Sequence, residues 1–200
     1  MHISEGVLSG EVLSAGAAIA VIGTGIGLSK IDYEKIVHVA ILSSAFFVAS
    51  LIHINIGPAS VHLILNGIVG LLLGFAAIPA ILTALLLQSI LFQYGGLTAL
   101  GVNVVIMAFP AVLSHYIFLP FLGKSSRLTF AAGFMAGLFS ILFACLLLGL
   151  ALWFTDKNFF ETSMAIIITY IPVMIIEGIV TGFCVSFLLK VYPEIIPERL

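Results

Sequence analysis

The first two residues, Met1 and His2, offer three nitrogen atoms that could hold one metal ion. Removal of an initiator methionine requires a small second residue. Because His2 is large, we expect Met1 to remain as the start of the mature chain. The terminal amine, the backbone nitrogen of His2 and its imidazole can then chelate one ion through small fused rings. Four nitrogens in a plane suit Ni(II) or Cu(II), and nitrogen ligands also suit Co(II).

A fourth nitrogen would have to come from another part of the chain. The best candidate is His62, which we expect at the start of a third helix, and His53 is a weaker candidate. Asn66 follows His62 by one helical turn, so we expect it to face the same way and to orient the His62 ring. The alternative interpretation is a mobile His2 and a His62 that is bonded to backbone, and spacing alone leaves both open.

Other polar side chains stand in strongly apolar surroundings. Glu177 is the one carboxylate deep inside an apolar run, where a charge is costly and is usually functional or paired. A structural bond to backbone, to Asn103 or to Gln88 and a role in transport are equally compatible with this position. The amides of Gln93 and Asn103 lie in or beside apolar runs and could form hydrogen bonds between helices.

The composition indicates a membrane protein. Hydrophobic residues make up 62% of the 200 residues and charged residues only 8%, whereas a soluble domain carries about 25% charged residues. A net charge of -2 leaves no basic face for nucleic acid. A spanning helix needs about 20 apolar residues. The apolar runs lie near residues 8–28, 35–53, 60–76, 78–93, 98–122, 128–154 and 164–190.

These runs predict an all-α fold, a polytopic bundle of about seven transmembrane helices that forms a single integral membrane domain over residues 1–200. The positive charges orient it, because cytoplasmic loops are enriched in Lys and Arg. With the N-terminus outside and the C-terminus cytoplasmic, the outer segments hold only Lys157. The inner segments then hold Lys30, Lys35, Lys124, Arg127, Lys190 and Arg199. This topology places His2, His53 and His62 near the outer face.

Enzyme signatures are missing from the sequence. There is no His-Glu-x-x-His, Gly-x-Ser-x-Gly or phosphate-loop motif, so we expect neither an enzyme nor an ATPase. Pairs of glycines four residues apart recur at Gly23 and Gly27, Gly70 and Gly74, and Gly133 and Gly137. Such pairs allow close helix packing, which we expect to be internal rather than against a partner.

Three stretches carry more specific patterns. They are Met1-His2-Ile3-Ser4-Glu5-Gly6-Val7-Leu8-Ser9, Ile56-Gly57-Pro58-Ala59-Ser60-Val61-His62-Leu63-Ile64-Leu65-Asn66-Gly67, and Leu87-Gln88-Ser89-Ile90-Leu91-Phe92-Gln93-Tyr94-Gly95-Gly96-Leu97-Thr98-Ala99-Leu100-Gly101-Val102-Asn103. A weaker match is Ile171-Pro172 with Glu177-Gly178. Together they resemble the CbiM/NikM family, the substrate-binding membrane subunits of energy-coupling-factor transporters for cobalt and nickel. The chain departs from the family at Ser4, where Pro is usual, and at Tyr170, where we expect His.

The resemblance implies that the N-terminal segment is tucked into the outer side of a seven-helix bundle. It implies a metal held by the Met1 amine, the His2 backbone and ring nitrogens, and His62. It also implies a plasma-membrane location, a membrane-embedded partner subunit and two cytoplasmic ATPase subunits. We expect Co(II) as the transported substrate, with Ni(II) as the alternative and no organic cofactor. A vitamin-binding subunit and a membrane anchor without substrate remain as other readings.

Overall fold

The computed structural model describes residues 2–56 and 59–195, without the side chains of Lys35 and of residues 53–56 and 59–61. The described residues are almost entirely helical. The α-helices are α1 (Gly10–Ser29), α2 (Ile36–Leu51), α3 (Asn66–Leu73), α4 (Ala77–Phe92), α5 (Leu100–Phe118), α6 (Ser126–Thr155) and α7 (Phe160–Val191). A small antiparallel hairpin, β1 (His53–Ile56) and β2 (Ala59–His62), separates α2 from α3.

Five described segments are long and apolar enough to cross a membrane, so the chain is a multi-pass membrane protein. They are Gly10–Ser29, Asn66–Phe92, Leu100–Phe121, Ser126–Thr155 and Lys157–Val191. The apolar helix α2 has 16 residues and is shorter than a full span. The predicted helical nature of the chain is therefore confirmed, whereas seven full-length spanning helices are not found among the described residues.

The difference arises at the predicted span over residues 60–76, which is not one helix. Its first residues belong to β2, and α3 begins only at Asn66 and has eight residues. Leu65, which precedes α3, has a left-handed backbone with φ +60°, so a helix cannot continue back through it. Gly74, with φ +53°, ends α3, and a short 3₁₀ turn leads into α4.

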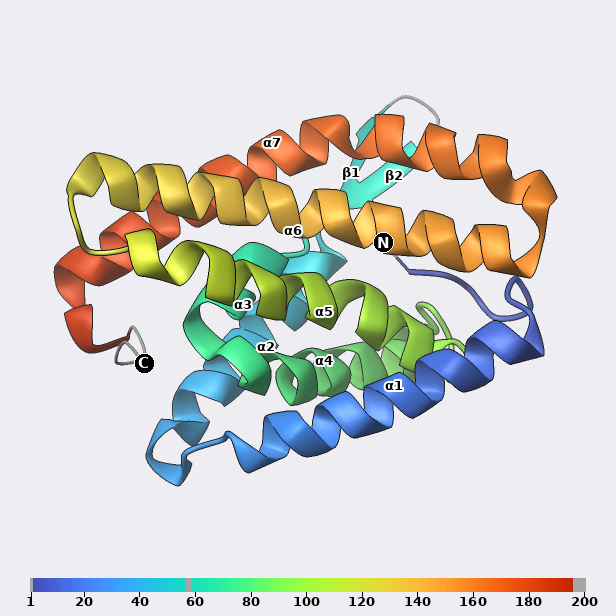
Figure 1. Ribbon diagram of the computed structural model, residues 1–200, viewed down its shortest axis with the longest axis horizontal. Helices are drawn as coiled ribbons and strands as arrows, with labels where there is room; N and C mark the ends of the chain where they lie inside the picture. Colours follow the sequence, from blue (N-terminus) through green and yellow to red (C-terminus); the bar gives the residue numbers. More distant parts are fainter. Residues whose placement is uncertain (1, 57–58, 196–200) are drawn as a thin grey trace.

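The long helices run roughly along one axis (Figure 1). Helices α7, α6 and α5 lie side by side, with α1 beyond α5, and these neighbours are in contact. The connections from α1 to α2 and from α5 to α6 lie at one end of the bundle, together with the last turns of α7 (Figure 1). The connection from α6 to α7 lies at the opposite end. The segment that precedes α1 starts in the middle of the bundle and runs out to that opposite end.

The glycine pairs pack helices within the chain, as expected. A Cβ atom added to Gly133 would lie 2.9 Å from the Cα atom of Gly182, so α6 and α7 touch through their backbones. A Cβ atom on Gly70 would overlap the Ala111 carbonyl of α5, and one on Gly27 would lie 2.5 Å from the Pro79 ring of α4. These close contacts set the spacing of the helices that surround α3.

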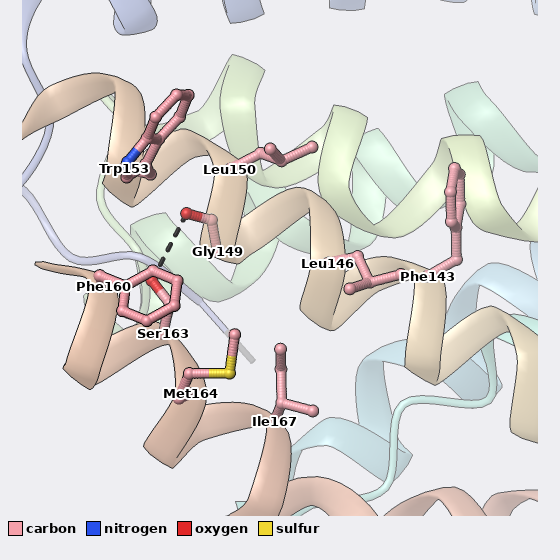
Figure 2. Close-up of a pocket in the computed structure, with 9 residues that line it drawn as sticks. All are labelled: Phe143, Leu146, Gly149, Leu150, Trp153, Phe160, Ser163, Met164 and Ile167. Carbon is pink, nitrogen blue, oxygen red and sulfur yellow. Dashed lines mark hydrogen bonds between the residues drawn. The ribbon is translucent and has the colours of Figure 1, made fainter. Parts of the chain in front are cut away.

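An open apolar hollow of about 480 Å³ lies on the surface between α6 and α7 (Figure 2). Its walls are mainly large apolar side chains, such as Phe143, Trp153 and Met164. The Ser163 hydroxyl donates to the Phe159 carbonyl at 2.8 Å, and the Gly149 carbonyl of α6 lies 3.4 Å from the same hydroxyl oxygen (Figure 2). None of the histidine, glutamate or amide residues singled out in the sequence lines this hollow, so it is separate from the polar site described next.

Candidate metal site

The segment before α1 is held by an amide on α5. The backbone N–H of Ile3 donates to Oδ1 of Asn103 at 2.9 Å, and Nδ2 of Asn103 donates to the Ile3 carbonyl at 3.1 Å. Both residues are buried, so this pair of hydrogen bonds satisfies backbone groups that water cannot reach. Asn103 therefore fixes the backbone one residue after His2, which is a more specific role than the bond between helices that the sequence suggested.

The turn between α4 and α5 makes room for the same segment. Gly95 and Gly96 have φ +77° and +84°, a conformation that favours glycine. A Cβ atom on Gly95 would lie 2.8 Å from Nδ2 of Asn103, and one on Gly96 would overlap the Glu5 side chain. Oε1 of Glu5 accepts the backbone N–H of Thr98 at 3.1 Å. The double glycine is thus required by the close approach of the N-terminal segment.

This anchoring brings His2 beside His62. Their ring centroids lie 5.2 Å apart and their planes make an angle of 26°. Nε2 of His2 lies 2.8 Å from Oε1 of Gln88 on α4. The amide nitrogen of Gln88 in turn donates to the hydroxyl of Ser50, and that hydroxyl donates to the Phe47 carbonyl.

The direction of this chain of hydrogen bonds assigns the His2 tautomer. Because Gln88 uses its nitrogen as the donor to Ser50, its oxygen is the atom that faces His2 and must accept. Nε2 of His2 therefore carries the proton, and Nδ1 carries the lone pair. Nδ1 is also the ring nitrogen nearest to the backbone, which is the one that can share a metal ion with the His2 main-chain nitrogen in a small ring.

The same reasoning assigns the tautomer of His62, with the roles of the two ring nitrogens exchanged. Its Nδ1 lies 3.0 Å from the Leu63 carbonyl oxygen, which can only accept, so Nδ1 carries the proton and Nε2 the lone pair. The side chain is only 5% exposed. Metal-binding histidines commonly donate their second ring N–H to a carbonyl or amide oxygen, which fixes the ring and its tautomer. In the neutral form, each imidazole therefore has one nitrogen oriented by an oxygen acceptor and its lone pair on the other nitrogen.

Glu177 lies next to the segment that carries His62. Its side chain is fully buried, at 0% exposed. The carboxylate accepts the backbone N–H groups of Ile64 and Leu65, with 2.9 Å from Leu65 N to Oε1. Of the roles that the sequence left open for Glu177, the structure shows the hydrogen bond to the backbone. Asn103 and Gln88, the other partners considered, are bonded to Ile3 and His2 instead.

The expectation that Asn66 orients the His62 ring is wrong. His62 ends a β-strand rather than starting a helix, so the one-turn spacing between the two residues does not exist. Leu63 takes the role of ring partner. The amide of Asn66 is fully buried, and neither its oxygen nor its nitrogen has a hydrogen-bond partner among the described residues.

The other predicted site residues are placed as follows. Gln93 is exposed and ends α4 with a left-handed backbone, φ +58°. His53 pairs with His62 in the register of the hairpin, but its side chain lies outside the described parts of the chain. Met1 also lies outside the described residues. Sequence reasoning did not assign Gln88 or Ser50 to the site, although a glutamine within an apolar helix was a usable signal.

In the described ranges no group of three or more His, Cys, Asp or Glu side chains could hold a metal ion. The two imidazoles that meet here offer nitrogen donors. Nitrogen donors suit late first-row transition metals rather than Mg²⁺ or Ca²⁺.

Known proteins resemble this chain in sequence and in fold. A relative from Haemophilus influenzae, named for metal transport, is 42% identical over 98% of this chain and 96% of its own length. A fused nickel transport protein, NikMN, of Archaeoglobus fulgidus is 26% identical over the whole of this chain and 69% of its own. The crystal structure of a transition metal transporter has the same fold, with a TM-score of 0.77 and 23% identity over 96% of this chain and 93% of that one.

The family model that describes the cobalt uptake substrate-specific transmembrane region matches residues 2–195. That match covers the hairpin, the Gly95-Gly96 turn and all seven α-helices named above. The resemblance found in the sequence is thereby confirmed. The chain belongs to the CbiM family of cobalt-uptake, substrate-specific transmembrane proteins.

Proposed function

We propose that this protein is the metal-binding membrane subunit of an energy-coupling-factor importer and that it captures Co(II) for uptake. One observation carries the proposal: His2 and His62, 60 positions apart, stack at 5.2 Å with one nitrogen of each ring already committed to an oxygen acceptor. The lone pairs then lie on Nδ1 of His2 and Nε2 of His62. A vitamin-binding site would need no such pair.

The full ligand set of the proposal has four nitrogens. The Met1 amine, the His2 main-chain nitrogen and Nδ1 of His2 form a chelate, and Nε2 of His62 completes it. The buried clamp between Ile3 and Asn103 supports this arrangement, because it brings the start of the chain into the bundle and keeps it there. Gln88, Asn103 and Glu177 serve as accessory residues that hold the ligands.

The proposed orientation places the N-terminus and the metal site toward the outside. Lys30 and Lys190 belong to the ends of α1 and α7, and Lys124 lies in the connection between α5 and α6. These segments gather at one end of the bundle, and Lys157, between α6 and α7, lies at the opposite end (Figure 1). The end that is rich in positive charge is the cytoplasmic end by the positive-inside rule. We further propose seven crossings in the plasma membrane.

Release of the ion would be driven by other subunits. The sequence has no nucleotide-binding motif, so we propose that a membrane-embedded partner and two cytoplasmic ATPases supply the energy. The metal itself has two candidates. The family description favours cobalt, whereas a planar set of four nitrogens favours Ni(II). We take cobalt as the substrate and nickel as the alternative.

The test is the metal content of the purified full chain with its natural N-terminus and a C-terminal tag. We expect one Co(II) or Ni(II) per chain, and competition between the two ions identifies the preferred one. Uptake of each ion by cells that express the complete transporter gives the second readout. Absence of stoichiometric metal together with binding of an organic vitamin would replace the proposal with the vitamin-binding reading.

A further inference from the structure

The peptide bond between Leu63 and Ile64 connects two parts of the site. Its carbonyl oxygen, on Leu63, accepts from Nδ1 of His62, and its N–H, on Ile64, donates to the Glu177 carboxylate. The carboxylate, the peptide group and the imidazole therefore form one continuous line of hydrogen bonds. In this line the Glu177 carboxyl group lies two hydrogen bonds away from the imidazole of His62.

The segment between β2 and α3 needs such a partner. Ile64 is fully buried, and Leu65 turns the chain with a left-handed φ of +60°. Neither residue is within a strand or helix ladder, so their N–H groups have no regular acceptor. A buried N–H without a partner is costly. Glu177 satisfies both groups at once, and Leu65 N reaches its two oxygens at 2.9 and 3.1 Å.

Close contacts between helix backbones fix the position of Glu177. A Cβ atom on Gly137 of α6 would lie 2.5 Å from the Glu177 carbonyl oxygen. A Cβ atom on Gly67 of α3 would lie 2.6 Å from the Cα atom of Gly137. Helices α3, α6 and α7 thus meet at one glycine, Gly137. Since packed backbones shift only as units, the Glu177 carboxylate keeps a fixed position beside the segment that carries His62.

We infer that Glu177 is a positioning residue for His62 and that it acts on the metal through the Leu63–Ile64 peptide bond. The carboxylate aligns that peptide, and the peptide carbonyl holds the His62 ring with its Nε2 lone pair toward the ion. Hydrogen bonds in such a chain polarise one another, so the carboxylate also makes the imidazole a better donor to the metal. This inference rests on the proposed function. It differs from a role of Glu177 as a ligand, because no contact between Glu177 and the ion is required.

The experiment uses Cu(II) as the probe, because its visible absorption band reports how many nitrogens surround it in a plane. The full chain is titrated in detergent as wild type and as Glu177→Gln, each with and without His62→Ala. Glutamine keeps the size of the side chain but offers one acceptor oxygen in place of two. The matched control is Glu161→Gln, an exposed glutamate in the first turn of the same helix.

We expect Glu177→Gln to weaken Cu(II) binding by about 10- to 100-fold, the usual effect of losing a partner of a metal ligand. The absorption band should move to longer wavelength, toward that of the three-nitrogen chelate. In the His62→Ala background the same substitution should change neither affinity nor band. Glu161→Gln should match the wild type. Should Glu177→Gln not yield folded protein, as judged by gel filtration, Glu177→Asp is compared in both backgrounds, with a smaller loss expected.

Two results would overturn the inference while leaving the proposed function in place. One is a Glu177→Gln protein with wild-type affinity and spectrum. The other is an equal loss of affinity in both backgrounds, which means that Glu177 acts on the whole fold or on the ion directly. The proposed function fails by a different result, a wild-type protein that binds no metal or a His62→Ala protein that binds it as the wild type does.

Discussion

The imidazole of His2 stacks on the imidazole of His62 with 5.2 Å between the ring centroids. One ring belongs to the segment that precedes the first helix, and the other belongs to the last residue of the β-hairpin. Each ring donates one N–H, to Gln88 and to the Leu63 carbonyl respectively. The two remaining ring nitrogens are the basis of the metal site that we propose, and the following predictions test the parts that hold them.

Replacement of His62 by alanine removes the fourth ligand. We expect the affinity for Co(II) and Ni(II) to fall by more than about 100-fold, since loss of a partner of a ligand already costs 10- to 100-fold. Isothermal titration of the purified chain measures it. His53→Ala is the control and should have a much smaller effect. An equal loss of metal affinity in both variants would mean that His62 is wrongly assigned as the ligand.

Extension of the chain before Met1 should abolish metal binding while the protein still inserts into the membrane. Three added residues convert the terminal amine into an amide, which removes it as a ligand. A single added residue is unsuitable for this test, because His2 would then be the third residue of the chain. A histidine in the third position can form a new chelate with the new terminal amine. The same three residues added after Leu200 are the control. Metal content after dialysis is the readout, and retained stoichiometric metal would exclude the amine as a ligand.

Removal of the acceptor for the His2 ring should weaken capture. In Gln88→Ala, Nε2 of His2 loses its partner at 2.8 Å, so the ring can rotate and exchange tautomers. We expect metal affinity about 10- to 100-fold lower. Gln93→Ala, at an exposed glutamine five residues further on, should behave as the wild type. Affinity titrations of both variants decide the point, and equal affinities for Gln88→Ala and wild type would contradict it.

Asn103→Ala should release the start of the chain from the bundle. The substitution breaks two hydrogen bonds to the buried Ile3 backbone, each worth about 1 kcal/mol. We expect faster trimming of the first residues by an aminopeptidase and a parallel loss of metal affinity. Mass spectrometry follows the trimming. Metal bound at saturating concentration should protect the variant, because binding restores the closed arrangement. Trimming at the wild-type rate would argue against this role.

Gly137→Ala should destabilise the bundle. Its Cβ atom would lie 2.5 Å from the Glu177 carbonyl, and such overpacking costs about 1–3 kcal/mol. Gly25→Ala in α1 is the matched control, because no atom lies within 4 Å of the added Cβ. At that position alanine should stabilise the helix by about 0.5–1 kcal/mol relative to glycine. Thermal unfolding in detergent should show opposite shifts of Tm, and equal shifts would mean that the α6–α7 contact is not tight.

Some features of the site could be predicted from the residues because they depend on local chemistry. The nitrogens of Met1 and His2 are adjacent along the chain, so a chelate can be proposed without knowledge of the fold, and it stays a prediction. His62 was identified as the best imidazole partner, and the structure places it against His2. The helical, membrane-embedded class followed from composition, since 8% charged residues cannot cover a surface that faces water.

The tertiary structure decided everything that depends on hydrogen bonds between distant segments. The sequence favoured a helix from residue 60, because an apolar run cannot reveal that Leu65 turns left-handed and that residues 59–62 pair with 53–56. That error misplaced Asn66 and hid the role of the Leu63 carbonyl. Glu177 and Gln88 are 113 and 86 positions from their partners Ile64 and His2. A single sequence shows that a buried polar group needs a partner, but only the packed helices determine which one it finds.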